Sequence, residues 1–144
     1  MRSFAQLLGV LLVLVGCEQE YGVYRAAILS EAPDGECIQR VLNTTPGITS
    51  VQYFGDTGYR GNYYFAYEGE EISAIAAVIL EEDGEVRFAQ SHVLINRRPP
   101  KGVLGRTRSI MRAVEERLEA ECGMVGLTSA VRETCLRIEC DGKD

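Results

Sequence analysis

The sequence predicts an α+β domain in which a single antiparallel β-sheet, a meander plus a C-terminal strand, carries two helices on one face. Short runs rich in β-branched and aromatic residues follow one another between glycine-containing breaks, as expected for strands joined by hairpins. Two other segments repeat their apolar residues every three or four positions, which is the period of an amphipathic helix. The 144 residues are enough for one such domain and too few for two.

The domain is expected to begin with a strand at residues 24–29. Pro33-Asp34-Gly35 then leads into a short helix at residues 36–43, which has Ile38, Val41 and Leu42 on one side. Thr44-Thr45-Pro46-Gly47 ends this helix. Strands follow at residues 48–54, 63–67, 72–80 and 86–95, and Asp83-Gly84 between the last two is typical of a hairpin turn.

The clearest helix follows Pro99-Pro100 and ends before Gly123, a natural C-terminal stop. Its apolar stripe consists of Val103, Thr107, Ile110, Met111, Val114, Leu118 and Cys122. A last strand is expected at residues 133–140, where Leu136, Ile138 and Cys140 alternate with Cys135, Arg137 and Glu139. The first set is expected to face the helices.

The first residues have the composition of a secretory signal peptide. Arg2 precedes an apolar run at residues 7–15, which is too short to span a bilayer, because a spanning helix needs about 20 apolar residues. The run ends at Leu14-Val15-Gly16-Cys17, and polar residues follow directly. This tetrapeptide resembles the lipobox of bacterial lipoproteins, in which a small residue precedes the cysteine that receives a thioether-linked diacylglycerol. An ordinary secreted protein and a buried helix are the alternatives, and neither explains the abrupt change to polar residues.

The resemblance implies that residues 1–16 are removed, that Cys17 carries the lipid, and that residues 17–23 tether a domain at residues 24–144. It also implies acylation of the new N-terminus, and two or more chains hold a protein stably on a membrane. In Gram-negative lipoproteins an aspartate after the cysteine retains the protein in the inner membrane. Glu18 stands at this position, which favours the outer membrane.

Four cysteines follow the lipidation site, at Cys37, Cys122, Cys135 and Cys140. In an oxidising envelope an even number indicates two disulfides, for which three pairings exist. A zinc site is the alternative, but no CxxC pair or nearby histidine supports it, so no metal or cofactor is expected. The predicted arrangement favours Cys122–Cys135, which closes a short loop, together with Cys37–Cys140.

The order of charges around the long helix is unusual. Bases precede and open the helix without an intervening acid, whereas Glu115, Glu116, Glu119 and Glu121 crowd its second half, against the helix macrodipole. A helix N-terminus with arginines suits lipid phosphates, lipopolysaccharide or an acidic protein face, and a solvated surface beside a loop is the alternative. The candidate binding residues of this basic segment are Arg97, Arg98, Lys101, Arg106 and Arg108.

Aromatic residues gather in the hairpin arm at residues 59–67. Alternation along the strand puts Tyr63 on one face and Tyr64 on the other. Exposed tyrosines contact proteins and glycans well, whereas packing within the core is the alternative. Tyr59, Tyr63 and Tyr64 are therefore added to the candidate binding residues.

Signals for catalysis are sparse. Asp56-Thr57-Gly58 resembles the triplet that carries the catalytic carboxylate of aspartic proteases, but those enzymes pair two carboxylates and this chain has one triplet, so a glycine-rich turn is favoured. His92, the only histidine, adjoins Ser91 in an expected strand, where neighbouring side chains point to opposite faces. The acidic clusters at residues 68–71 and 81–85 are expected at opposite ends of a strand, too far apart to share a metal.

The expected protein is a membrane-anchored, non-enzymatic envelope lipoprotein that binds another envelope protein or an anionic surface component. Removing residues 1–16 takes away only Arg2 among the charged residues, so the formal net charge of −6 becomes −7. Such an acidic protein is not expected to bind nucleic acid. The alternatives are an inhibitor or soluble-ligand binder that uses the loop at residues 56–60 and, more remotely, an aspartic-protease-like hydrolase using Asp56.

Overall fold

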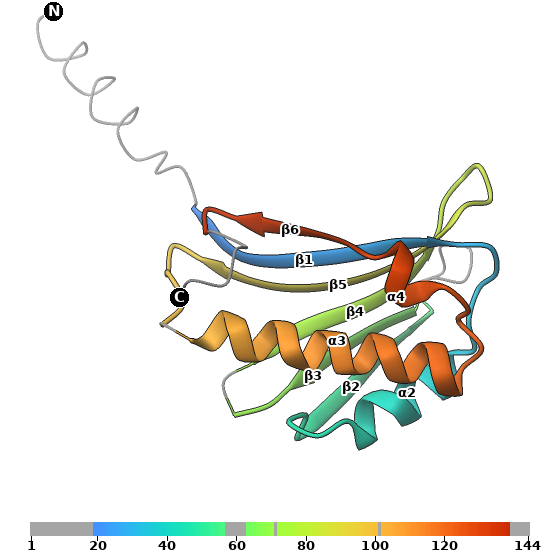
Figure 1. Cartoon of the computed structure of the whole chain (residues 1–144), viewed down its shortest axis with the longest axis horizontal. Helices are drawn as coiled ribbons and strands as arrows, with labels where there is room; N and C mark the ends of the chain where they lie inside the picture. The colour runs from blue at the N-terminus through green and yellow to red at the C-terminus, as the bar shows by residue number, and fades with distance from the viewer. Residues whose placement is uncertain (1–18, 57–62, 71, 101, 139–144) are drawn as a thin grey trace, which may run out of the picture.

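The computed structural model describes residues 19–56, 63–70, 72–100 and 102–138, which form one antiparallel sheet with helices on one face (Figure 1). The strands lie in the order β2-β3-β4-β5-β1-β6. The predicted α+β class is therefore confirmed, and the meander β2 to β5 follows the predicted order. The elements are β1 (Glu20–Leu29), α2 (Gly35–Thr44), β2 (Ser50–Asp56), β3 (Tyr63–Glu68), β4 (Ser73–Leu80), β5 (Val86–Ile95), α3 (Val103–Glu121), α4 (Leu127–Ala130) and β6 (Arg132–Leu136).

The turns form where the sequence supplies the required residues. Asp34 caps α2, because its side chain accepts a hydrogen bond from the backbone N–H of Glu36 at 3.2 Å. In the β4–β5 hairpin, Gly84 has a φ of 87°, which favours glycine, as predicted for Asp83-Gly84. In the β3–β4 turn a Cβ at Gly69 would lie 2.0 Å from the carbonyl oxygen of Gly47, so only glycine fits there.

The core lies between the sheet and the two longer helices. Helix α2 contributes the predicted apolar side to this layer, and α3 contributes most of the predicted stripe. Large side chains of β3 and β5 fill the opposite wall. The core cluster includes Val23, Ile38, Val41, Leu42, Phe65, Tyr67, Val78, Phe88, Met111, Val114, Leu118 and Leu127.

The predicted phase of the last strand was wrong. Strand β6 ends at Leu136, because Arg137 adopts a φ of 52°, outside the extended region. Cys135 pairs with Val23, which is fully buried under the helices, and directly opposed residues of antiparallel strands share a face. Cys135 therefore faces the helix layer and Leu136 faces away, the reverse of the prediction, while Cys140 lies outside the described residues.

The predicted disulfide pairing was also wrong. Cys37 of α2 is bonded to Cys122 at the end of α3, with a Cα–Cα distance of 5.8 Å. The two helices pack side by side on the sheet, and this packing brings together cysteines 85 positions apart in sequence. Cys135 is disulfide-bonded as well. The bond between Cys37 and Cys122 excludes both Cys122–Cys135 and Cys37–Cys140.

The first strand begins earlier than predicted. It starts at Glu20 rather than at residue 24, and its whole length pairs with β5, from Glu20 opposite Ile95 to Leu29 opposite Val86. Residues 20–23, which were expected to belong to the tether, are thus part of the sheet. Helix α4, a single short turn before β6, was not predicted.

Candidate functional site

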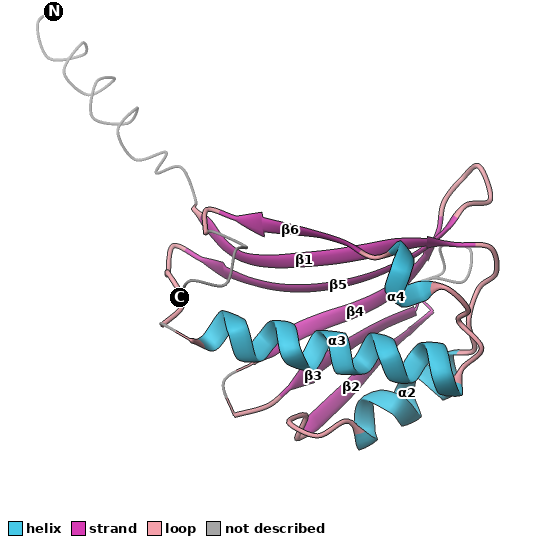
Figure 2. Cartoon of the chain, in the orientation of Figure 1, coloured by secondary structure: helices cyan, strands magenta, loops and turns pink. Residues whose placement is uncertain are grey.

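No described helix covers the second face of the sheet (Figure 2). Side chains alternate along each strand, so the positions between the helix-facing ones point to this uncovered side. The uncovered side of an antiparallel sheet is usually polar, whereas this one is built mainly of aliphatic, alanine and tyrosine residues. We call this surface the open sheet face; it consists of Tyr24, Ala26, Ile28, Tyr64, Ala66, Ile75, Ala77, Ile79, Ala89, Ser91, Val93 and Ile95.

The centre of the open sheet face is continuous and uncharged. Pairing between neighbouring strands joins Tyr24, Ser91, Ile75 and Ala66 into one row across β1, β5, β4 and β3. Ile75 in this row exposes 49% of its surface. Charged strand residues on this side stand at the strand ends or on the edge strand β6: Glu20, Glu68, Arg87 and Arg132. An uncharged aliphatic surface of this kind is typical of an interaction site.

The structure separates the three candidate tyrosines. Tyr64 lies on the open sheet face, where it pairs with Ala77 of β4. Tyr63 lies on the helix side, half-buried, and packs against the core. The Tyr63 ring lies beside Gly35 at the start of α2, which favours the alternative that this residue packs against the core. Tyr59 lies outside the described residues, as do the residues that follow Asp56 in the protease-like triplet.

The basic segment is only partly available for binding. Arg97 and Arg98 are exposed in the loop between β5 and α3, and Lys101 lies outside the described residues. Arg106 is exposed in the first turns of α3. The Arg108 guanidinium pairs with the Glu133 carboxylate of β6 at 2.6 Å and is only 18% exposed, so it is less available than the other described arginines of this segment.

A groove opens at the end of the sheet where α3 begins. One cavity of about 420 Å³ is lined by Glu68, Glu70, Ser73, His92, Arg97 and Val103, among others. A second cavity of about 160 Å³ shares Glu70 and Val103 with it and extends along α3 to Thr107 and Ile110. We call the two together the end groove. The groove brings Arg97 of the basic segment to the same end as one of the predicted acidic clusters.

The histidine of the end groove is a buried sheet residue. His92 is 2% exposed, and its Nδ1 lies 2.6 Å from the carbonyl oxygen of Ser73. In the tautomer that carries its hydrogen on Nδ1, this nitrogen donates to the carbonyl oxygen. Its Nε2 is buried and has no partner among the described residues. Ser91 stands on the opposite face, in the row of Tyr24 and Ile75. The predicted separation of Ser91 from His92 is confirmed.

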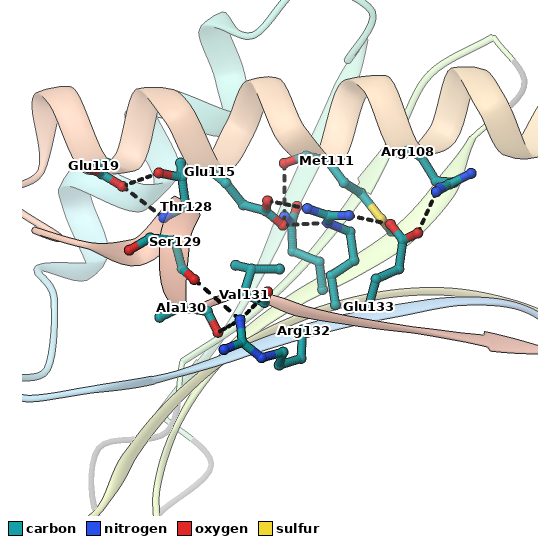
Figure 3. Close-up of polar contacts among 12 residues, drawn as sticks. Arg108, Met111, Glu115, Glu119, Thr128, Ser129, Ala130, Val131, Arg132 and Glu133 are labelled. Carbon is teal, nitrogen blue, oxygen red and sulfur yellow. Dashed lines mark hydrogen bonds and ion pairs between the residues drawn. The ribbon is translucent and has the colours of Figure 1, made fainter. Parts of the chain in front are cut away.

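The sequence did not predict a network of buried polar side chains under α3 (Figure 3). The Arg25 guanidinium of β1 makes two hydrogen bonds to the Glu115 carboxylate of α3, both at 2.8 Å, and also pairs with Glu133. Gln90 donates to Glu115 at 3.0 Å and accepts a hydrogen bond from the Tyr67 hydroxyl at 2.8 Å. The network therefore joins α3 to β1, β3, β5 and β6.

The pKa values of Arg25 and Tyr67 are raised. Hydrogen bonding to Glu115 raises the pKa of Arg25, and burial raises the pKa of Tyr67 far above its usual range. Glu115 is only 1% exposed, so the ion pair is closed to solvent. The signal that could have revealed the network lay in the strand pattern, because Arg25 and Gln90 occupy inward positions between apolar residues.

Acid is expected to weaken the ion pairs that Glu133 makes with Arg25 and Arg108. Burial alone would raise the pKa of Glu133, but hydrogen bonds from Arg108 and Arg25 hold it below its usual value. The unfolded chain therefore takes up the proton first, and the stabilisation is complete above the unfolded pKa of about 4.3 and is lost as pH falls through the lower native value. Urea denaturation at a series of pH values should show a smaller acid loss for Glu133→Gln than for wild type. Equal losses would contradict this role.

Within the described parts of the chain, no group of three or more histidine, cysteine or carboxylate side chains is arranged to hold a metal ion. Among the same residues, no helix combines the length and apolar character needed to cross a membrane. A comparison of the chain with protein-family models, curated proteins and solved structures finds no match.

Proposed function

We propose that this protein is a lipid-anchored, non-enzymatic lipoprotein of the bacterial cell envelope that binds another envelope protein through its open sheet face. The lipobox-like tetrapeptide ending at Cys17 supports the anchor, and Glu18 after it favours the outer membrane. The single observation that carries the binding role is the open sheet face itself. It is aliphatic and uncharged at its centre, and Ile28, Ile75, Val93 and Ile95 on it are exposed.

The chemistry of the open sheet face defines the partner. Rows of alanines beside isoleucine and tyrosine make a surface that a flat, uncharged and partly apolar protein surface would complement. Ile28 and Ile75, each 49% exposed, would lose their remaining contact with water in such a complex. The uncharged centre does not suit a polyanion, because it offers no cation to pair with phosphates.

Placing a charge at the centre of this surface should abolish partner binding without unfolding the domain. We expect Ile75→Lys to eliminate the complex recovered from crosslinked cells, because a buried unpaired ammonium is costly in an apolar interface. Because Ile75 is already half exposed, the unfolding free energy should change by no more than about 0.5 kcal/mol. Affinity capture of the tagged, lipidated protein followed by mass spectrometry measures the first effect, and thermal denaturation measures the second.

The matched control is Val125→Lys. Val125 is 89% exposed in the loop between α3 and α4 and is not a strand residue of the open sheet face, so the same charge there should leave the complex intact. Equal recovery of the partner by Ile75→Lys and wild type would contradict the role of the open sheet face. Loss of the partner from the Cys17→Ala variant alone would support the anchor but leave the face without a role.

A further inference from the structure

The start of the described chain is held at one end of the sheet, beside the β5–α3 loop that carries Arg97 and Arg98. The backbone N–H of Gln19 donates to the side-chain oxygen of Asn96 at 2.8 Å, and the N–H of Asn96 donates to the carbonyl of Gln19 at 2.6 Å. Cys17 precedes Gln19 by two residues, which span at most about 7 Å when extended. A lipid on Cys17 would therefore be attached close to Asn96 and Arg97.

The side chains around this position combine apolar surface with positive charge. Ile95 is 56% exposed and Val93 is 37% exposed, and Arg97 and Arg98 are exposed in the loop that follows. Tyr21, on the helix side of the same sheet end, adds an aromatic ring whose hydroxyl donates to the Gln19 side chain at 2.6 Å. Aliphatic and aromatic side chains beside arginines are typical of surfaces that enter the headgroup region of an anionic bilayer. We call Tyr21, Val93, Ile95, Arg97 and Arg98 the anchor end.

We propose that the anchor end docks onto anionic phospholipid, with Ile95 at the boundary between headgroups and acyl chains and with Arg97 and Arg98 on lipid phosphates. The proposal rests on the lipid anchor of the proposed function, because attachment at Cys17 brings this end to the bilayer. Strand β1 then leads away from the membrane over ten residues, about 33 Å. The rest of the open sheet face, beyond Val93 and Ile95, remains accessible to a protein partner.

The distribution of acids supports this orientation. At the anchor end, Glu20 lies opposite Ile95, and Glu68 and Glu70 line the end groove with Arg97, so they offset part of the positive charge. Arg98 is not among the residues that line the groove. In the described part of the other end, β4 and β5 are joined by the acidic turn at residues 81–85, whose negative charge Arg87 offsets only in part through its pairs with Glu81 and Glu85. An anionic bilayer would therefore attract the anchor end more than the opposite end.

The first test uses tryptophan, which the chain lacks. The lipidated Ile95→Trp variant is reconstituted into vesicles of phosphatidylglycerol and phosphatidylcholine whose acyl chains carry bromine, a fluorescence quencher. We expect loss of most of the fluorescence for Ile95→Trp and none for the control Val125→Trp. Full fluorescence of the Ile95→Trp variant on vesicles with which it floats would overturn the docking. Failure of the lipidated chain to float with vesicles would instead overturn the anchor on which the proposal depends.

The second test removes the charges. The mature chain with Cys17→Ser is sedimented with phosphatidylglycerol vesicles, so that only the anchor end holds it. Combining Arg97→Gln with Arg98→Gln should lower partitioning about 25-fold, or about fivefold per arginine. The control combines Arg112→Gln with Arg132→Gln, which changes the net charge equally at positions away from this end, and should lower it less than about twofold. Equal losses for the two pairs would overturn the assignment of Arg97 and Arg98 to lipid phosphates.

Discussion

Replacing Glu115 by leucine is expected to destabilise the fold by about 3–5 kcal/mol, because it leaves the buried Arg25 guanidinium with Glu133 as its remaining carboxylate partner. Gln90 would also lose one of its two hydrogen-bond acceptors and keep only the carbonyl of Met111. Urea denaturation measures the loss. The neighbouring Glu116 is exposed, so the control Glu116→Leu should change stability by no more than about 0.5 kcal/mol.

Replacing both Arg25 and Glu115 tests whether the loss in Glu115→Leu comes from an unpaired charge or from altered packing. The double variant Arg25→Leu and Glu115→Leu leaves no uncompensated charge between β1 and α3, so its loss should be smaller than the sum of the two single losses. Additive losses would mean that the two side chains do not interact, contrary to their two hydrogen bonds at 2.8 Å.

Loss of the Cys37–Cys122 disulfide is the second large effect. The bond closes a loop across a sequence separation of 85, and on loop entropy alone Cys37→Ser combined with Cys122→Ser should cost about 3–5 kcal/mol. Both cysteines lie at the α2–α3 contact. Because serine is neutral, the two substitutions introduce no charge there. Denaturation of the double variant measures the loss.

Peptide mapping of the oxidised wild-type protein provides the matching chemical test. Proteolysis without reduction should release one peptide pair that joins the segments around Cys37 and Cys122. A peptide that joins Cys122 to Cys135 would contradict the pairing. A double variant with wild-type stability would show instead that the bond forms but constrains a region already compact in the unfolded chain.

The alternation and period of apolar residues were sufficient to predict most of the fold. The predicted strand at residues 86–95 matches β5 at both ends, and the long helix was predicted to within one residue. The failures came from contacts between distant segments. The phase of β6 depends on its pairing with β1, where Glu133 turns inward to meet Arg25, and no local pattern contains that information.

The candidate site was less predictable than the fold. The disulfide depends on how α2 and α3 pack, whereas the predicted pairing of Cys122 with Cys135 followed from the expected arrangement of the long helix and the last strand. The apolar character of the open sheet face has a signal in the sequence. The strand at residues 73–80 is apolar at successive positions, which indicates apolar side chains on both faces rather than one. The pairing of the candidate Arg108 with Glu133 could not be predicted, because the two residues are 25 positions apart in sequence.

The most direct test of binding through the open sheet face is photo-crosslinking in living cells with a photoreactive residue in place of Ser91. Ser91 lies at the centre of the row that joins Tyr24 and Ile75. We expect a single envelope protein to be linked from this position, the link to disappear when Ile75→Lys is added, and no link from the same probe in place of Val125. Identical adducts from both positions, or adducts to lipid alone from Ser91, would contradict binding of another protein by this face.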